Sequence, residues 1–203
     1  MRILSRKISL IIYIIIAVIV LTLSNTGVIS LWSSGIAAIA NSTARFTDKN
    51  GYVIKDKYSI YIDLSDLKSN IGKELYNDGK NRITVGWLDN TGAVGSGGYR
   101  IGFRAHGHYT LNGATLISGV RHVTVNQNSF TTGMSAKMTA VYNGKTYNCS
   151  EFSTSGLNYK DGDEFGFYIF PGDVYNNHEV SLNEKGTVYL TISELYKNVW
   201  SVK

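Results

Sequence analysis

Two closely spaced histidines are the residues whose type and spacing most directly suggest chemistry. His106 and His108 are separated by one glycine, so on a β-strand both imidazoles would project from the same face and could chelate zinc or copper. A closed metal site needs further ligands. No His, Cys or carboxylate close to them in the sequence supplies one, so we expect exposed strand histidines and no metal.

Three carboxylates cluster in the segment Asp161-Gly-Asp-Glu164. Asp161 and Asp163 are candidate calcium ligands, because Ca²⁺ prefers carboxylate oxygens. The segment lacks the twelve-residue loop with a terminal Glu that a calcium-binding loop of this type needs. We therefore expect a solvated turn that leads into a strand.

The single cysteine, Cys149, cannot form a disulfide within the chain. We expect a small buried apolar residue, and the alternatives are an intermolecular bridge or a reactive thiol. The glycines of Gly95–Gly102 suggest a phosphate loop, but such a loop is followed by a helix. A strand-like run follows here, so these glycines indicate a hairpin loop.

No motif in the sequence points to an enzyme. A zinc-protease helix, a nucleophile elbow and a local catalytic cysteine signature are all missing, and we expect no cofactor. Three of the 20 basic residues precede the first apolar run, which leaves seventeen against 15 acidic residues. The basic residues are scattered singly, so we expect no nucleic-acid partner.

The elements that must position these residues are β-strands. Apolar residues alternate with polar or small ones in seven segments: Tyr58–Leu64, Arg82–Leu88, Gly98–Arg104, 115–125, 136–142, 164–170 and 186–192. Turn residues separate the segments, and Asn143-Gly144 is the strongest hairpin signal. Only Leu64–Tyr76 fits a short helix. We predict one antiparallel β-sandwich or jelly roll over residues 58–203.

An uncharged apolar segment precedes this domain. No charged residue lies between Lys7 and Arg45, and the segment opens with the apolar run Leu10–Leu21 behind three basic residues. Basic residues followed by an apolar run are typical of an export signal or a membrane helix. Residues 1–44 are therefore predicted to be a signal peptide or a retained membrane anchor, and the rest of the chain is predicted to lie outside the cell.

Signal peptidase requires small residues three positions and one position before the bond that it cuts. Ser42 and Ala44 meet this requirement for cleavage before Arg45. Ala38 and Ala40 meet it for cleavage before Asn41. We predict processing at one of these positions, with an uncleaved anchor as the alternative.

The residues behind the uncharged run resemble the leader end of a known family. Ser42, Ala44, Phe46, Thr47 and Asp48 match, in this order, the leader end of the TasA/camelysin-like biofilm-fibre proteins and their archaeal pilus relatives. The resemblance implies a jelly-roll domain, secretion, removal of the leader and assembly into extracellular fibres. In such fibres the N-terminal segment of each subunit is inserted as a strand into its neighbour.

The segment 45–57 has the composition of such a tail. Its apolar residues Phe46, Tyr52, Val53 and Ile54 are few and are interrupted by Asp, Lys, Asn and Gly. Extended, it would reach roughly 35–40 Å, which is enough to enter an adjacent subunit. These four residues are the candidate donor strand, and the alternative is that they form the first strand of their own sheet.

We therefore expect an exported structural subunit that assembles head to tail with copies of itself. Its other partners would be the export machinery and signal peptidase. A type IV pilin-like subunit that keeps its N-terminal helix is the alternative, although Ser5–Ser9 matches the pilin processing signal poorly. A β-sandwich binding module or a membrane-active protein is a further alternative, but no basic amphipathic helix supports it.

Overall fold

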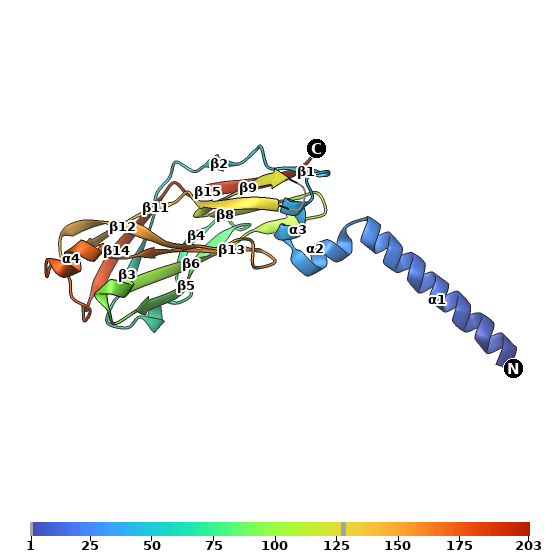
Figure 1. Ribbon diagram of the computed structural model, residues 1–203, viewed down its shortest axis with the longest axis horizontal. Coiled ribbons are helices and arrows are strands. Elements are labelled where there is room, and N and C mark those ends of the chain that lie inside the picture. Colours follow the sequence, from blue (N-terminus) through green and yellow to red (C-terminus); the bar gives the residue numbers. More distant parts are fainter. Residues whose placement is uncertain (1, 127–128) are drawn as a thin grey trace.

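The chain folds into antiparallel β-sheets behind an N-terminal helix, as the sequence predicts. The structure is a computed structural model that describes residues 2–126 and 129–203, with side chains from residue 11 onward. Helix α1 projects from one end of an elongated β-domain (Figure 1). The C-terminus lies at the same end of this domain.

Three helices form the N-terminal segment. They are α1 (Arg2–Asn25), α2 (Val28–Ser34) and α3 (Ile36–Asn41). Gly27 and Gly35 separate them, with φ angles of 77° and 56°. Glycine adopts such angles without the strain that other residues would have, so the two glycines determine where the helices break.

The described strands form three sheets. Their bounds are β1 (Phe46–Thr47), β2 (Tyr52–Val53), β3 (Tyr58–Asp63), β4 (Glu74–Asn77), β5 (Arg82–Asn90), β6 (Tyr99–His106), β7 (His108–Thr110), β8 (Gly113–Ser118), β9 (Val120–Asn126), β10 (Ser129–Met134), β11 (Lys137–Tyr142), β12 (Lys145–Thr154), β13 (Gly162–Tyr168), β14 (Thr187–Ser193) and β15 (Tyr196–Val202). Three short helical pieces complete the fold: η1 (Lys68–Asn70), η2 (Val94–Ser96) and α4 (Gly172–Asn176).

The largest sheet has eight strands in the order β3-β14-β11-β12-β13-β6-β5-β4. Strand β12 pairs with β11 over residues 145–149 and with β13 over residues 150–154, where the register shifts between Glu151 and Ser153. The edge strands β3 and β4 approach each other near Tyr58 and Tyr76. The centres of these two rings are 5.0 Å apart, and the rings meet edge to face. A second sheet has the order β1-β15-β8-β7 with β2 also on β15, and β9 pairs with β10.

The seven predicted strand segments all contain strands, and Asn143-Gly144 forms the predicted turn between β11 and β12. The predicted helix over Leu64–Tyr76 is wrong. That segment contains the short turn η1 and then β4. The reason is Asn70, whose buried side-chain amide donates to the carbonyls of Asp63 and Asp66 and so holds a loop in place of a helix.

The core fills the space between the sheets with aromatic and branched side chains. Phe103 and Phe165 stack at 5.4 Å, and both are fully buried. Phe167 and Phe170 are covered as well. Alternate residues of strands such as β5 and β14 are buried, which gives the period of two in the sequence.

Candidate functional site

The two histidines of the candidate metal site lie on different sheets. Strand β6 ends at His106 and β7 begins at His108, because the chain leaves one sheet for the other at Gly107. The Gly107 amide donates to the Asp161 carbonyl at 2.6 Å. A Cβ at Gly107 would lie 2.4 Å from the Thr115 carbonyl oxygen, so only glycine fits this crossing.

His106 is part of a charged cluster at the surface. Its Nδ1 lies 2.8 Å from Oδ2 of Asp161, and Arg104 pairs with the other oxygen of that carboxylate. Burial acts to raise the pKa of Asp161, but the hydrogen bond from His106 and the charge of Arg104 outweigh it and keep this pKa below its usual value. The Arg104 guanidinium also lies 3.7 Å from the centre of the Tyr159 ring.

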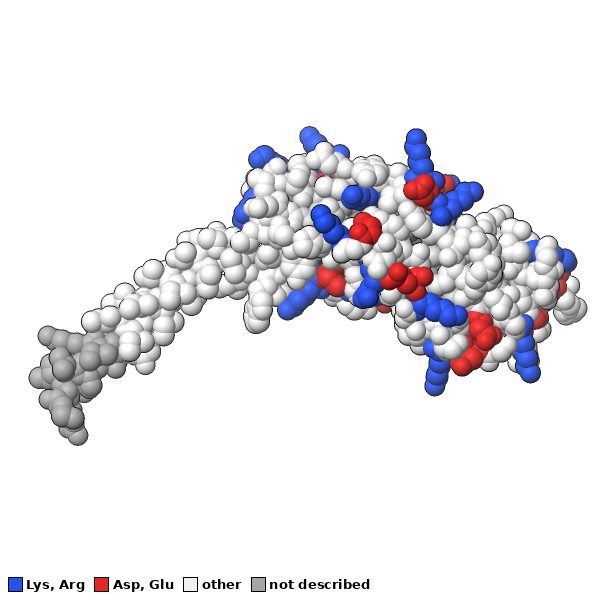
Figure 2. Space-filling view, turned by 180° about the vertical axis from the view of Figure 1, so that it is seen from behind, with Lys and Arg blue, Asp and Glu red and all other residues white. Residues whose placement is uncertain are grey.

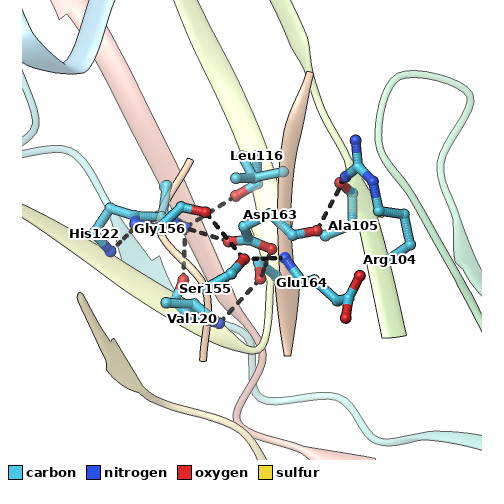
Figure 3. Close-up of polar contacts among 11 residues, drawn as sticks. Arg104, Ala105, Leu116, Val120, His122, Ser155, Gly156, Asp163 and Glu164 are labelled. Carbon is cyan, nitrogen blue, oxygen red and sulfur yellow. Dashed lines mark hydrogen bonds and ion pairs between the residues drawn. The ribbon is translucent and has the colours of Figure 1, made fainter. Parts of the chain in front are cut away.

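The second aspartate of this segment points into the domain. Asp163 is fully buried, and its Oδ1 accepts a 2.6 Å hydrogen bond from the Ser118 hydroxyl. Its Oδ2 lies 2.6 Å from Nε2 of His122, whose side chain is also fully buried (Figure 3). Asp161 and Asp163 therefore belong to separate clusters and do not face one ion together.

The buried cluster extends to the backbone around the turn between β8 and β9. Ser118 Oγ accepts from the Val120 amide at 3.0 Å, and Asn198 Oδ1 accepts from the His122 amide at 2.9 Å. Asn198 also donates to the Val120 carbonyl at 2.9 Å. These contacts join β9 to β13 and β15 through polar groups inside the core.

The cluster does not have the geometry of a catalytic triad. Ser118 and His122 bond to different oxygens of Asp163, whereas a catalytic serine gives its proton to the histidine. No local motif predicts this cluster, because Ser118 and His122 lie far from Asp163 in the chain. Among the described residues, no group of three or more His, Cys, Asp or Glu side chains is placed to hold a metal ion.

Cys149 is half-buried against the core, and its thiol donates to the Ile169 carbonyl at 3.2 Å. Burial raises the pKa of Cys149 to about 12, so the thiol stays protonated and unreactive at neutral pH. This agrees with its interpretation as a small apolar residue.

The glycine-rich segment forms the predicted hairpin loop between β5 and β6. Gly97 has a φ angle of 90°, and a Cβ there would lie 1.9 Å from the Tyr168 ring. Glycine is therefore required both by the backbone angle and by the close packing.

The predicted leader does not end where the folded domain begins. Helix α3 lies inside residues 1–44, yet Ile36, Ile39 and Ala40 are 0%, 3% and 2% exposed. They occupy one helical face and are part of the same core as the strands. The folded unit therefore begins at α3, before residue 45 and before the predicted domain start at residue 58.

Both predicted processing positions lie in this packed segment. Ala38 and Ala40 belong to α3, and Ser42 and Ala44 lie in the turn that follows it. The Thr124 hydroxyl donates to the carbonyl of Ala40 at 3.3 Å. Cleavage at either position would remove Ile36, Ile39 and Ala40 from the core.

Arg45 ties the helical segment to two other parts of the chain. Its guanidinium donates to the Thr26 carbonyl at 3.2 Å and to the Leu111 carbonyl at 2.9 Å. Its own carbonyl accepts from the Lys203 amide at 3.0 Å. One side chain thus joins the α1–α2 junction to the β7–β8 turn, and its backbone holds the C-terminus.

The candidate donor strand pairs with its own domain in the single chain. Phe46 is buried in β1, which pairs with β15, and the Ile54 amide donates to the Leu195 carbonyl at 2.7 Å. Tyr52 and Val53 form β2, which also pairs with β15, but their side chains are 53% and 46% exposed. The tail is therefore fixed at Phe46 and Ile54 and covered less between them.

A cavity of about 480 Å³ lies between the helical segment and the β-domain. Its lining includes Gly27, Leu31 and Ser34 from the α2 side, and Arg45 and Leu111 opposite them. The helical segment therefore leaves an open space beside the point where Arg45 holds it.

Helix α1 projects away from this junction, and the side chains that the structure describes on it are mostly exposed. Its large apolar side chains from Ile11 to Leu23 are between 38% and 70% exposed. On the face shown in Figure 2, basic and acidic residues are interspersed over the β-domain, and the described part of the helix carries no charge. No single helix with described side chains is long and apolar enough to cross a membrane. The helical segments Ile11–Asn25 and Val28–Ser34 together have the length and composition of a membrane span, but a bend of 68° separates them.

Comparison of the chain with protein-family models, curated proteins and solved structures gives no match.

Proposed function

We propose that this protein is an exported structural subunit that keeps its N-terminal apolar helix, and that copies assemble through this helix into a surface filament. The observation that supports retention is the burial of Ile36 and Ile39 in the core of the β-domain. A chain that had lost its leader would lack these residues. Of the two assembly modes considered from the sequence, the geometry favours the pilin-like one.

The orientation follows from the charges that flank the apolar run. Arg2, Arg6 and Lys7 precede it, and the next charged residue is Arg45. Basic residues stay preferentially on the cytoplasmic side of a membrane helix. These charges support a β-domain that lies outside the cell.

The exposed surface of α1 provides the element for assembly. A helix that is apolar on all sides needs a cover of lipid or of other protein. Residues 8–25 span roughly 27 Å at 1.5 Å per residue, close to the roughly 30 Å of a bilayer core. We place this helix in the bilayer before assembly and against copies of itself in the filament.

A structural role agrees with the polar clusters of the domain. Asp163 is bonded to Ser118 and His122, and Asp161 to His106 and Arg104. The two carboxylates are thus used to hold strands and loops together. This supports a scaffold function for the domain.

Retention is tested by the intact mass of the protein in filaments sheared from cells. We expect a mass that includes Ile8–Ala40, together with filaments in negative-stain electron microscopy. A mature chain that begins at Asn41, Arg45 or Phe46 would overturn the proposal.

The role of α1 is tested by placing a charge on it. Ile15→Asp should abolish filaments and leave the circular dichroism of the β-domain unchanged, because a carboxylate is costly in an apolar helix bundle or a bilayer. Thr146→Asp, at an exposed position of β12, is the matched control and should leave filaments intact.

Assembly by strand donation is the second candidate, supported by the weak attachment of the tail. Strands β1 and β2 have two residues each, and Tyr52 and Val53 are half exposed. Such short pairings can exchange between copies at little cost. The exchanged segment would be residues 45–54.

Deletion of residues 45–54 separates the two candidates. Strand donation predicts a folded domain that no longer polymerises and whose melting temperature rises when the tail is added as a peptide. The retained-helix proposal predicts a strongly destabilised domain, because the deletion removes buried Phe46 and the contacts of Arg45. Circular dichroism with and without peptide distinguishes these results.

A further inference from the structure

Helix α2 exposes two of its large apolar side chains, Ile29 and Trp32. Trp32 is 76% exposed and Ile29 is 39% exposed, and they lie three positions apart in the sequence, so they share one helical face. Neither lines the cavity beside α2, whereas Ser30, Leu31 and Ser34 do. A helix on the surface of a water-soluble domain shows the opposite distribution.

The direction of α2 differs sharply from that of α1. The two helices meet at a bend of 68° around Gly27, where φ is 77°. When α1 runs along the bilayer normal, this bend brings α2 closer to the membrane plane than to the normal. Only two residues separate the end of α1 from the start of α2, so α2 starts at the membrane boundary when α1 spans the bilayer.

A lysine of the β-domain lies beside the exposed tryptophan. The Lys160 ammonium is 5.2 Å from the centre of the Trp32 ring. Tryptophan is enriched at membrane–water interfaces, and lysine there extends its ammonium to the phosphates. The neighbouring Asp161 is occupied by Arg104 and His106, so its charge is compensated within the protein.

We infer that α2 lies in the interfacial layer of a lipid bilayer, with Trp32 and Ile29 at the boundary between headgroups and acyl chains. This inference depends on the proposed function, in which α1 is retained in the membrane before assembly. Ile36, two residues after the end of α2, donates its amide to the Lys160 carbonyl. This bond links the position of α2 to that of the β-domain. The interface thereby fixes how the domain stands on the membrane.

The test uses the full chain in vesicles of equal parts phosphatidylcholine and phosphatidylglycerol, with bromine atoms on the lipids at different depths. The difference in tryptophan emission between the wild-type chain and the Trp32→Phe variant isolates the Trp32 signal. We expect loss of most of this signal with bromines near the headgroups and a smaller loss with bromines at the bilayer centre. Trp87→Phe, on the β-domain, is the control and should leave this quenching unchanged.

Flotation of the vesicles separates the possible failures. A chain that floats with the vesicles and whose Trp32 signal is not quenched would overturn the inference and leave retention of α1 standing; shielding by a second copy gives this result. Quenching only by bromines at the bilayer centre would also overturn it. A chain that does not float would overturn the inference and the membrane-held state of the proposed function together.

Discussion

The main-chain amide of Ile36 donates a 2.8 Å hydrogen bond to the carbonyl oxygen of Lys160. This bond joins the apolar N-terminal segment to the loop between β12 and β13. Gly35 makes the approach possible, because a Cβ at this position would lie 1.9 Å from the same carbonyl oxygen. The contact determines where the helical segment leaves the β-domain.

We predict that Gly35→Ala lowers the free energy of unfolding by more than the unfavourable backbone angle alone would. The added methyl group overlaps the Lys160 carbonyl, and φ at this position is 56°. This φ is combined with a ψ of −128°, a sparsely populated region that alone costs alanine about 1–3 kcal/mol. Displacing α3 from the core adds to this cost. The melting temperature of Gly35→Ala should therefore fall by several degrees more than that of a variant that changes only the backbone angle.

Gly79→Ala is the matched control for the backbone term. Gly79 has a φ angle of 83°, and a Cβ there would have no atom within 4 Å. Its substitution should show only the cost of the angle. Equal melting temperatures for the Gly35 and Gly79 variants would contradict the close contact with Lys160.

The burial of α3 gives a second prediction. Ile39→Ala removes a side chain that is 3% exposed, and it should lower the free energy of unfolding by about 2–5 kcal/mol. Ile29→Ala removes the same atoms from a 39% exposed position, where we expect a much smaller change. Urea unfolding followed by circular dichroism measures both. If both variants unfolded at the wild-type midpoint, α3 would not be part of the folded unit.

The strands could be predicted where one face is buried and the other is not. Tyr58–Leu64 and Arg82–Leu88 alternate clearly, and they become β3 and β5. Strand β12, Lys145–Thr154, has no such alternation, and only Tyr147 in it is fully buried. Its place comes from pairing with β11 and β13, which is a long-range property.

The end of the leader was harder to place because two patterns overlap there. The small residues Ala38, Ala40, Ser42 and Ala44 fit a processing signal. The spacing of Ile36, Ile39 and Ala40 also fits one face of a helix, and this weaker signal is the one that the structure uses for packing. Three residues are too few for periodicity alone to decide.

The buried polar cluster gives a third prediction. Asp163→Asn removes the charge that His122 and Ser118 contact in the core, and it should cost about 3–5 kcal/mol of stability. Asp161→Asn removes a carboxylate that is 39% exposed, and it should cost no more than about 1 kcal/mol. Equal unfolding midpoints for the two variants would contradict a structural role for Asp163.

Acid sensitivity of the loop after β4 gives a fourth prediction. Burial acts to raise the pKa of Asp78, but hydrogen bonds from the Asn81 and Lys80 amides and from the Asn81 and Tyr76 side chains lower it to about 2. A lowered carboxyl pKa contributes stability above the ordinary value of 3.8, and this contribution is lost as pH falls towards about 2.

Asp78→Asn should therefore flatten the fall of the melting temperature below about pH 4, because an amide has no charge to lose. Asp56→Asn changes another carboxylate of an exposed loop and is the control. Thermal unfolding across this pH range provides the comparison. A wild-type and an Asp78→Asn curve that stay parallel would contradict the role of Asp78.

The last prediction concerns the histidines. Replacing His106 and His108 together by Gln should change stability by no more than about 1 kcal/mol, because His108 is exposed and the His106 contact with Asp161 lies at the surface. Gln at position 106 retains an amide that can donate to Asp161. Treatment of the wild type with a chelator should leave its melting temperature unchanged. A metal held by these residues would give the opposite pair of results: both the double variant and the chelated wild type would lose several degrees, since a bound metal can supply several kcal/mol of folding free energy.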